Sequence, residues 1–220
     1  GYFQGPSAAI GNFTFTAQTG TNLFVAKYDS LGSVLWAKAG VTLGQSIGED
    51  IESDQFGNTY FLGSYSGPTL TLGSASVVSQ NGCVIAAKFD QSGTVLWLKN
   101  VGYKNNAPYG HLAITIDGSG NSYITGQASS NFSMPVDSLI LTKLDNSGNV
   151  LWQKYATGTN WNTYSMATDP LGNSYVAGRI SGGTSLDLHG AVLTNTITGA
   201  TIFIAKYDAS GNLIWAKSVG

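Results

Sequence analysis

Residues 27–38 read KYDSLGSVLWAK, and this phrase returns three more times along the 220-residue chain. The four copies occupy residues 27–38, 88–99, 143–154 and 206–217. Their tryptophans, Trp36, Trp97, Trp152 and Trp215, are separated by 61, 55 and 63 residues. Repeats of this length suit one four-stranded sheet each rather than a pair of helices. The phrase therefore predicts a repeat protein built from antiparallel β-sheets.

A second phrase, Asp-x-x-Gly-Asn-x-Tyr-x-x-Gly, precedes the first one in three repeats, at residues 54–63, 117–126 and 169–178. In both phrases an Asp-x-x-Gly turn separates two β-rich runs. Its Asp can accept backbone N–H bonds, and its Gly supplies the positive φ that ends the turn. Each complete repeat is therefore predicted to hold two hairpins. In the third repeat, a first strand ends at Asp117, and the second, third and fourth strands cover residues 122–126, 139–144 and 150–155.

The third and fourth strands are apolar on both alternating faces apart from their lysines, which predicts a sheet packed between two neighbouring sheets. We interpret the repeated tryptophans as the core between these sheets. The predicted fold class is all-β: one β-propeller region over residues 1–220, built of four-stranded antiparallel blades. The four blades expected are residues 1–40, 41–102, 103–158 and 159–220.

The first of these blades is expected to be partial, because Gly1 aligns with Gly63 of the second repeat. It then lacks a first strand and most of a second one. Two interpretations follow: the chain is an excerpt of a longer polypeptide or an arc of a larger ring, or it forms a tight four-bladed ring.

Composition argues against several function classes. Charged residues make up only 10% of the chain, the net charge is −2, and eight of the ten basic residues belong to the repeated phrase. Such a chain has no basic patch for nucleic acid or anionic membrane, and no apolar run is long enough for direct membrane insertion. Cys83, the only cysteine, aligns with polar positions and is expected to be a partly exposed, inert thiol. We expect no catalytic residues, metal or cofactor, because no nucleophile–base pair, metal triad or phosphate loop is present.

The varied segments are predicted to lie on one face, opposite the uniform Asp-x-x-Gly turns. They are residues 64–82, 127–138 and 179–200 within the repeats, and 40–49, 101–110 and 157–163 between them. Ligand sites favour loops held by a rigid scaffold, so this face is the expected binding face. Its aromatic and amide side chains suit a glycan. The candidate ligand-binding residues are Tyr103, Asn105, Tyr109, His111, Trp161 and Asn162. Alternatively, Trp161 and Tyr109 only cover the gap between adjacent blades.

The acidic residues Glu49, Asp50 and Glu52 cluster at the start of an expected inner strand. A cation site, a solvated strand entrance and a glycoside-hydrolase carboxylate pair remain open interpretations of this cluster. The turn at residues 145–149 superficially resembles a calcium loop but lacks the downstream glutamate of an EF-hand, which favours a conformational role.

Together the two phrases resemble the bacterial β-propeller repeat called SBBP, most closely at residues 24–29 and 203–208. The resemblance covers essentially the whole chain, and the third repeat departs most, with Leu144 in place of an aromatic residue. It implies a propeller within a secreted or surface-exposed bacterial protein, often a large one that sometimes carries a type IX sorting domain. It implies no single enzymatic activity.

We therefore expect a non-catalytic extracellular module, part of a longer polypeptide, that recognises a protein or carbohydrate through the variable-loop face. A passive spacer or assembly domain of a large surface protein is the alternative, and a carbohydrate-active enzyme is a distant one.

Overall fold

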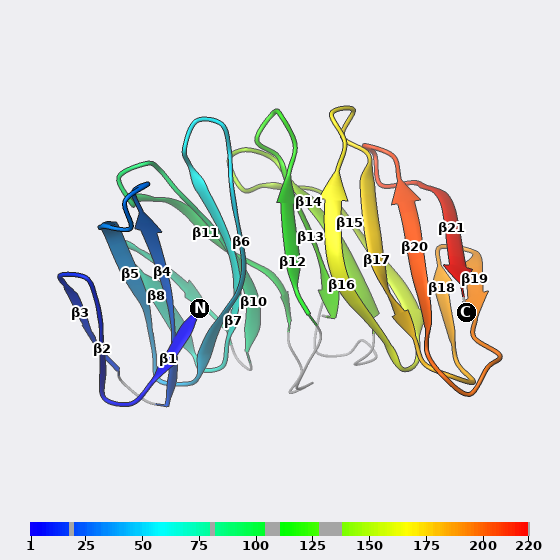
Figure 1. Ribbon diagram of the computed structural model, residues 1–220, viewed down its shortest axis with the longest axis horizontal. Coiled ribbons are helices and arrows are strands. Elements are labelled where there is room, and N and C mark those ends of the chain that lie inside the picture. Colours follow the sequence, from blue (N-terminus) through cyan, green and yellow to red (C-terminus); the bar gives the residue numbers. More distant parts are fainter. Residues whose placement is uncertain (18–19, 80–81, 104–110, 128–137, 220) are drawn as a thin grey trace. The chain divides into compact units, whose positions relative to one another are not determined.

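The computed structural model in Figure 1 describes residues 1–17, 20–79, 82–103, 111–127 and 138–219. All regular secondary structure in these residues is β-strand, as predicted. No helix that could span a membrane occurs among them. The chain forms two compact parts, residues 1–104 and 105–220, called here the N-terminal part and the C-terminal part. Each is described by itself.

The N-terminal part contains one complete four-stranded sheet, one incomplete sheet and a separate hairpin. The complete sheet has the order β11-β10-β7-β6, and the incomplete one the order β1-β4-β5-β8-β9. The hairpin is β2-β3. The strands are β1 (Tyr2–Gln4), β2 (Ser7–Ile10), β3 (Phe13–Thr16), β4 (Thr21–Tyr28), β5 (Val34–Thr42), β6 (Ser46–Ser53), β7 (Thr59–Tyr65), β8 (Thr69–Leu72), β9 (Ala75–Val78), β10 (Cys83–Phe89) and β11 (Val95–Tyr103).

The C-terminal part contains two sheets, which follow the order β12-β13-β14-β15-β18-β19 and the order β16-β17-β20-β21. The third repeat forms an antiparallel meander of β12, β13, β14 and β15, as the sequence predicts, and the fourth repeat forms one of β16, β17, β20 and β21, with β18 and β19 inserted between its second and third strands. The strands are β12 (Ala113–Ile116), β13 (Ser122–Gln127), β14 (Ser138–Leu144), β15 (Val150–Gly158), β16 (Trp161–Thr168), β17 (Ser174–Ile180), β18 (Ser185–Leu188), β19 (Ala191–Thr194), β20 (Thr201–Tyr207) and β21 (Leu213–Val219).

All seven Asp-x-x-Gly turns adopt one conformation. The turn glycines have φ between 76° and 83°, and each donates its N–H to the C=O of the turn aspartate at 2.9–3.1 Å. One carboxylate oxygen of each aspartate accepts the N–H groups two and four residues further on. The aspartate thereby satisfies backbone donors that the tight turn leaves unpaired. The turn chemistry predicted from the sequence is confirmed.

The segments between the second and third strands are not loops, which corrects the expectation for residues 64–82 and 179–200. Each folds into a hairpin that adds to the fourth strand of the preceding repeat. In the N-terminal part β8 pairs with the end of β5, from Gly40 opposite Leu72 to Thr42 opposite Leu70. In the C-terminal part β18 pairs with the end of β15. The two repeats within each part are therefore joined by backbone hydrogen bonds as well as by side-chain packing.

Side chains between neighbouring sheets form one core in each part. In the N-terminal part Trp36 of β5 is 5% exposed, stacks on Phe89 with 5.4 Å between ring centroids, and donates its indole N–H to the carbonyl of Gln91. The interpretation of this tryptophan as core between two sheets is confirmed. In the C-terminal part Trp152 makes the same indole bond to the carbonyl of Ala209.

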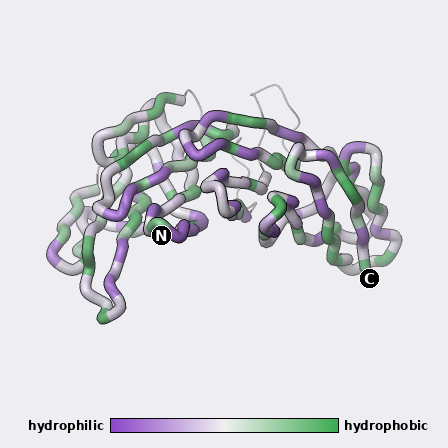
Figure 2. Tube along the Cα trace, turned by 90° about the horizontal axis from the view of Figure 1, so that it is seen from above, coloured by the Kyte–Doolittle hydropathy of each residue, from purple (hydrophilic) through white to green (hydrophobic). Residues whose placement is uncertain are grey.

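Burial differs among the third and fourth strands, although all were expected to be fully enclosed. The third strands β10 and β14 are buried at every residue, whereas the third strands β4 and β20 and the fourth strands β15 and β21 include half-exposed and exposed residues. Figure 2 shows hydrophobic and hydrophilic residues interspersed along the trace. The expectation of complete burial is therefore confirmed for β10 and β14 and wrong for β15 and β21.

Cys83 at the start of β10 is fully buried, and not partly exposed as expected. Its thiol donates to the Ser79 hydroxyl at 2.9 Å. Burial raises the pKa of the thiol, and the contact with Ser79 only partly opposes that effect. The environment therefore supports the expectation of an inert thiol, since the thiolate is disfavoured.

Candidate functional site

Trp161, the leading candidate from the sequence, begins β16 instead of lying in a loop between repeats. Its side chain is 2% exposed and belongs to the core of the C-terminal part, beside Ile180 and Leu186. A platform for a sugar requires an exposed ring face. The expected exposure of Trp161 is therefore wrong, because the hairpin of the fourth repeat and its sheet close over the indole.

His111, another candidate, lies on the surface of the C-terminal part. The His111 ring is exposed and meets the 48% exposed ring of Tyr164 edge-on, with 5.4 Å between centroids. The carbonyl of His111 accepts a hydrogen bond from the hydroxyl of Thr163, which fixes the backbone beneath these rings.

Asn162 lies opposite Arg179 in the β16–β17 ladder. The amide oxygen of Asn162, when turned towards Arg179, accepts a hydrogen bond from Nη2 of Arg179 at 3.3 Å. In this orientation the amide nitrogen of Asn162 donates to the carbonyl of Trp161 at 3.1 Å. The amide is thus engaged within the sheet. Of the remaining candidates, Asn105 and Tyr109 lie outside the described residues, and Tyr103 is described only as the end of β11, paired with Cys83.

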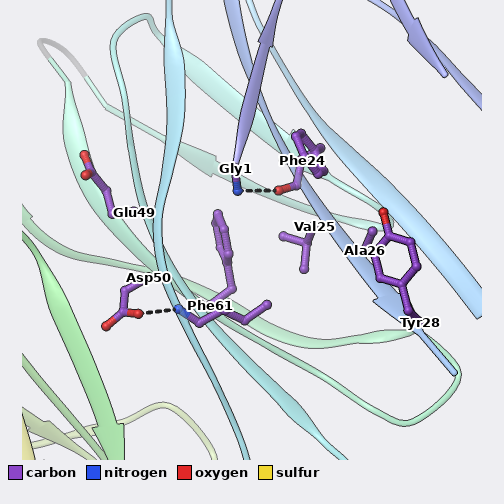
Figure 3. Close-up of a pocket in the computed structure, with 9 residues that line it drawn as sticks. Gly1, Phe24, Val25, Ala26, Tyr28, Glu49, Asp50 and Phe61 are labelled. Atoms are coloured by element: carbon purple, nitrogen blue, oxygen red, sulfur yellow. Dashed lines mark hydrogen bonds between the residues drawn. The ribbon is translucent and has the colours of Figure 1, made fainter. Parts of the chain in front are cut away.

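The acidic cluster lies beside a cavity of about 260 Å³ in the N-terminal part (Figure 3). Glu49 and Asp50 are among its lining residues, together with Phe24, Ala26 and Tyr28 of β4. The carboxylate of Asp50 turns back to accept the N–H of Ile51 at 2.8 Å, and Glu49 accepts the hydroxyl of Ser64 at 3.3 Å.

Glu52 completes the acidic cluster on β6. Burial, and secondarily the negative charge of Asp50, raise the pKa of Glu52. Within the described part of the chain, no three His, Cys, Asp or Glu side chains converge to hold a metal ion. Asp50 and Glu49 make hydrogen bonds within the chain, as expected of a hydrogen-bonded strand entrance.

Three clusters of lysine, tyrosine and aspartate recur where the second and third strands of a repeat meet the Asp-x-x-Gly turn. The ammonium group lies over the tyrosine ring, at 4.7 Å for Lys88 and Lys143 and at 4.9 Å for Lys206. The tyrosines are Tyr60, Tyr123 and Tyr175, which are the cross-strand partners of these lysines.

The turn aspartate completes each cluster. Lys143 lies 3.9 Å from the carboxylate of Asp117, which also accepts the Tyr123 hydroxyl at 3.1 Å and the Asn121 amide at 2.8 Å. Burial acts to raise the pKa of Asp117, but these hydrogen bonds outweigh it, and the pKa lies below its usual value. The carboxylate is saturated by protein donors, so it serves the fold and leaves no oxygen free for a ligand.

Sequence reasoning did not find these lysine clusters, although a signal was present. The lysine always precedes Tyr-Asp, Phe-Asp or Leu-Asp, and the second phrase always carries its tyrosine. Pairing the two phrases across one ladder would have placed each lysine opposite its tyrosine.

Comparison with known proteins agrees with the repeat structure. Residues 152–184 match the family model described as SBBP, beta-propeller repeat. No curated protein matches the chain. The matched segment runs from Trp152 of β15 to the residue before β18, and so contains a fourth strand, the Asp169 turn and the next second strand. The resemblance noted in the sequence is confirmed there: residues 152–184 carry a β-propeller repeat of the SBBP type.

Proposed function

We propose that this chain is a non-catalytic module of a secreted or surface-exposed bacterial protein, and that its partners are polypeptides bound by β-structured surfaces. One observation carries the proposal: the variable segments at 69–78 and 185–194 add strands to neighbouring sheets and do not form ligand loops. A sheet that grows by accepting strands offers backbone hydrogen bonds to further extended polypeptides.

The test is a selection of displayed random peptides against the whole chain, with an unrelated all-β protein of similar size as the control target. We expect enrichment of β-rich sequences with alternating apolar residues. Failure to enrich any sequence above the control target would contradict the proposal. The location is tested by brief protease treatment of intact cells, which should release peptides of this chain.

Glycan recognition is the second candidate, and the exposed contact between His111 and Tyr164 favours it. Aromatic surfaces of this kind can pack against the apolar face of a sugar ring. A glycan array probed with the unmodified chain and with a His111→Ala/Tyr164→Ala double variant separates the candidates. A glycan signal that disappears in the double variant would favour this second function.

A further inference from the structure

The hairpin of β2 and β3, drawn in blue in Figure 1, ends in the two-residue turn Gly11-Asn12 between the paired residues Ile10 and Phe13. Gly11 has a φ of +57°, which the first position of a type II′ turn requires, and Asn12 follows it at the tip. Asn12 begins the tripeptide Asn12-Phe13-Thr14, which has the form Asn-x-Ser/Thr of an N-glycosylation acceptor. Acceptors of this form lie in surface loops of secreted proteins.

The two side chains that define the acceptor are accessible. Asn12 and Thr14 are both exposed. Within the described part of the chain, neither side chain makes a hydrogen bond or an ion pair. The amide nitrogen of Asn12, the atom that forms the bond to a sugar, is therefore open to an enzyme and held by none of the described residues.

Exposure of the tip is a general property of these hairpins. The hairpins β8–β9 and β18–β19 have two-residue turns of the same length, and each pairs with the fourth strand of the preceding repeat. The residues that correspond there to Asn12 and Thr14 are all exposed: Ser74, Gly190, Ser76 and Val192. A hairpin of this kind therefore keeps its tip accessible when it is docked on a neighbouring strand.

An attached sugar does not enter the packing of the hairpin. Alternate residues of a strand point to opposite faces. Ile10, Phe13 and Phe15 are half-buried on one face, whereas Ala9 and Thr14 are exposed on the other. The sugar would extend into solvent from the tip, so the glycosylated chain is expected to keep the same fold.

We propose that Asn12 is a site of N-glycosylation whose co-substrate is a sugar diphosphate. The amide nitrogen of Asn12 attacks the anomeric carbon of the sugar, the bond from that carbon to the diphosphate oxygen breaks, and the diphosphate leaves with the electron pair. One amide proton passes to a base of the transferase. Lipid-linked and nucleotide-linked sugars share this chemistry. The inference goes beyond the proposed function, because it does not depend on the binding of polypeptides.

The test uses the whole chain with the substitution Asn131→Gln, because residues 131–133 form the second Asn-x-Ser/Thr motif of the sequence and lie outside the described residues. In one arm the folded chain meets an oligosaccharyltransferase and a lipid-linked oligosaccharide. In the other it meets an N-glycosyltransferase and a nucleotide-linked hexose. Both enzymes are chosen to require only the three-residue motif, and mass spectrometry reads the intact chain and its peptides.

We expect a sugar on the peptide that contains Asn12 in at least one arm, and that arm identifies the class of donor. Asn12→Gln and Thr14→Val should abolish the modification, whereas Thr14→Ser should retain it. All of these changes are at exposed positions, and circular dichroism checks that the variants fold. No modification in either arm, while a reference acceptor peptide is modified in both, would overturn the proposal. A sugar that persists in Asn12→Gln would refute the site.

Two further variants, made in the Asn12→Gln chain, test the role of the hairpin tip. Ser74→Asn creates an acceptor motif with Ser76 at the tip of β8–β9, and it should be modified within about fivefold of the rate at Asn12. Leu151→Thr creates a motif that begins at Asn149, an exposed residue whose amide donates to the carboxylate of Asp145 at 3.0 Å. That motif should react at least about tenfold more slowly, because the hydrogen bond must first break. Equal rates at Asn149 and Asn12 would contradict selection by a free amide.

Discussion

Replacement of Trp36 by alanine tests whether packing between neighbouring sheets holds the repeats together. The ring is 5% exposed, stacks on Phe89 of the next repeat, and covers Gly93, where an added Cβ would lie 2.6 Å from the indole. Burial of a tryptophan removes roughly 150–250 Å² from water, worth about 4–6 kcal/mol at ~25 cal/mol per Å². Alanine keeps part of this contact, and the site partly collapses. We therefore expect a loss of about 3–5 kcal/mol in the free energy of unfolding.

The assay is equilibrium unfolding in urea followed by circular dichroism, with hydrogen exchange of the β10 amides as a local measure of the N-terminal part. Trp36→Phe keeps an aromatic ring on Phe89 and should lose about half as much stability as Trp36→Ala. Trp215→Ala is the matched control, because that tryptophan is only partly buried and its ring contact is an edge-on one with Tyr175 of its own repeat. We expect it to cost roughly 2 kcal/mol. Equal losses for Trp36→Ala and Trp215→Ala would refute the reasoning.

Three further predictions concern the turns and the buried thiol. Gly32→Ala should cost about 1–2 kcal/mol in the free energy of unfolding, because φ is +83° there, although no atom lies within 4 Å of an added Cβ. Gly93→Ala should cost more, because φ is +82° and the added Cβ would also meet Trp36. Parallel urea titrations of the two variants compare these losses. The lowered pKa of Asp117 contributes stability that is fully present above the unfolded pKa of ~3.9 and is lost as pH falls through the lower folded pKa. Between pH 4 and pH 2 the melting temperature should therefore fall more steeply in the unmodified chain than in Asp117→Asn, and identical slopes would contradict this. Cys83 should resist a thiol reagent at neutral pH and react fully in denaturant, and fast labelling of the folded chain would show that its burial is wrong.

The sequence predicted those features that depend on local chemistry repeated several times. The Asp-x-x-Gly turns follow from the backbone needs of a tight turn, so Asp29 and Gly32 behave as their counterparts do in every repeat. The burial of Trp36 was predicted because the strand that carries it is apolar on both of its faces. Such features need no knowledge of distant contacts, because each repeat carries its own signal.

The features that the sequence did not predict depend on long-range pairing. Residues 69–78 alternate between apolar and polar side chains, but nothing local indicates that β8 will add to β5. The burial of Trp161 likewise depends on Leu186 of the hairpin and on Ile180 of the next strand. The sequence around Trp161 suggested an exposed ring in a loop. It could not indicate these contacts, because they form only when the hairpin docks on the preceding repeat.

The pairing of β8 with β5 and of β18 with β15 has a consequence for how such chains change length. If a gene segment that encodes one whole sheet were duplicated, each hairpin would be separated from the strand that it completes. A duplication cut between a third and a fourth strand would copy both partners together, as in the matched segment from Trp152 onward. The unit that can be duplicated is therefore offset from the sheet, and a recombination that respects this offset preserves the hydrogen bonds between β5 and β8 and between β15 and β18.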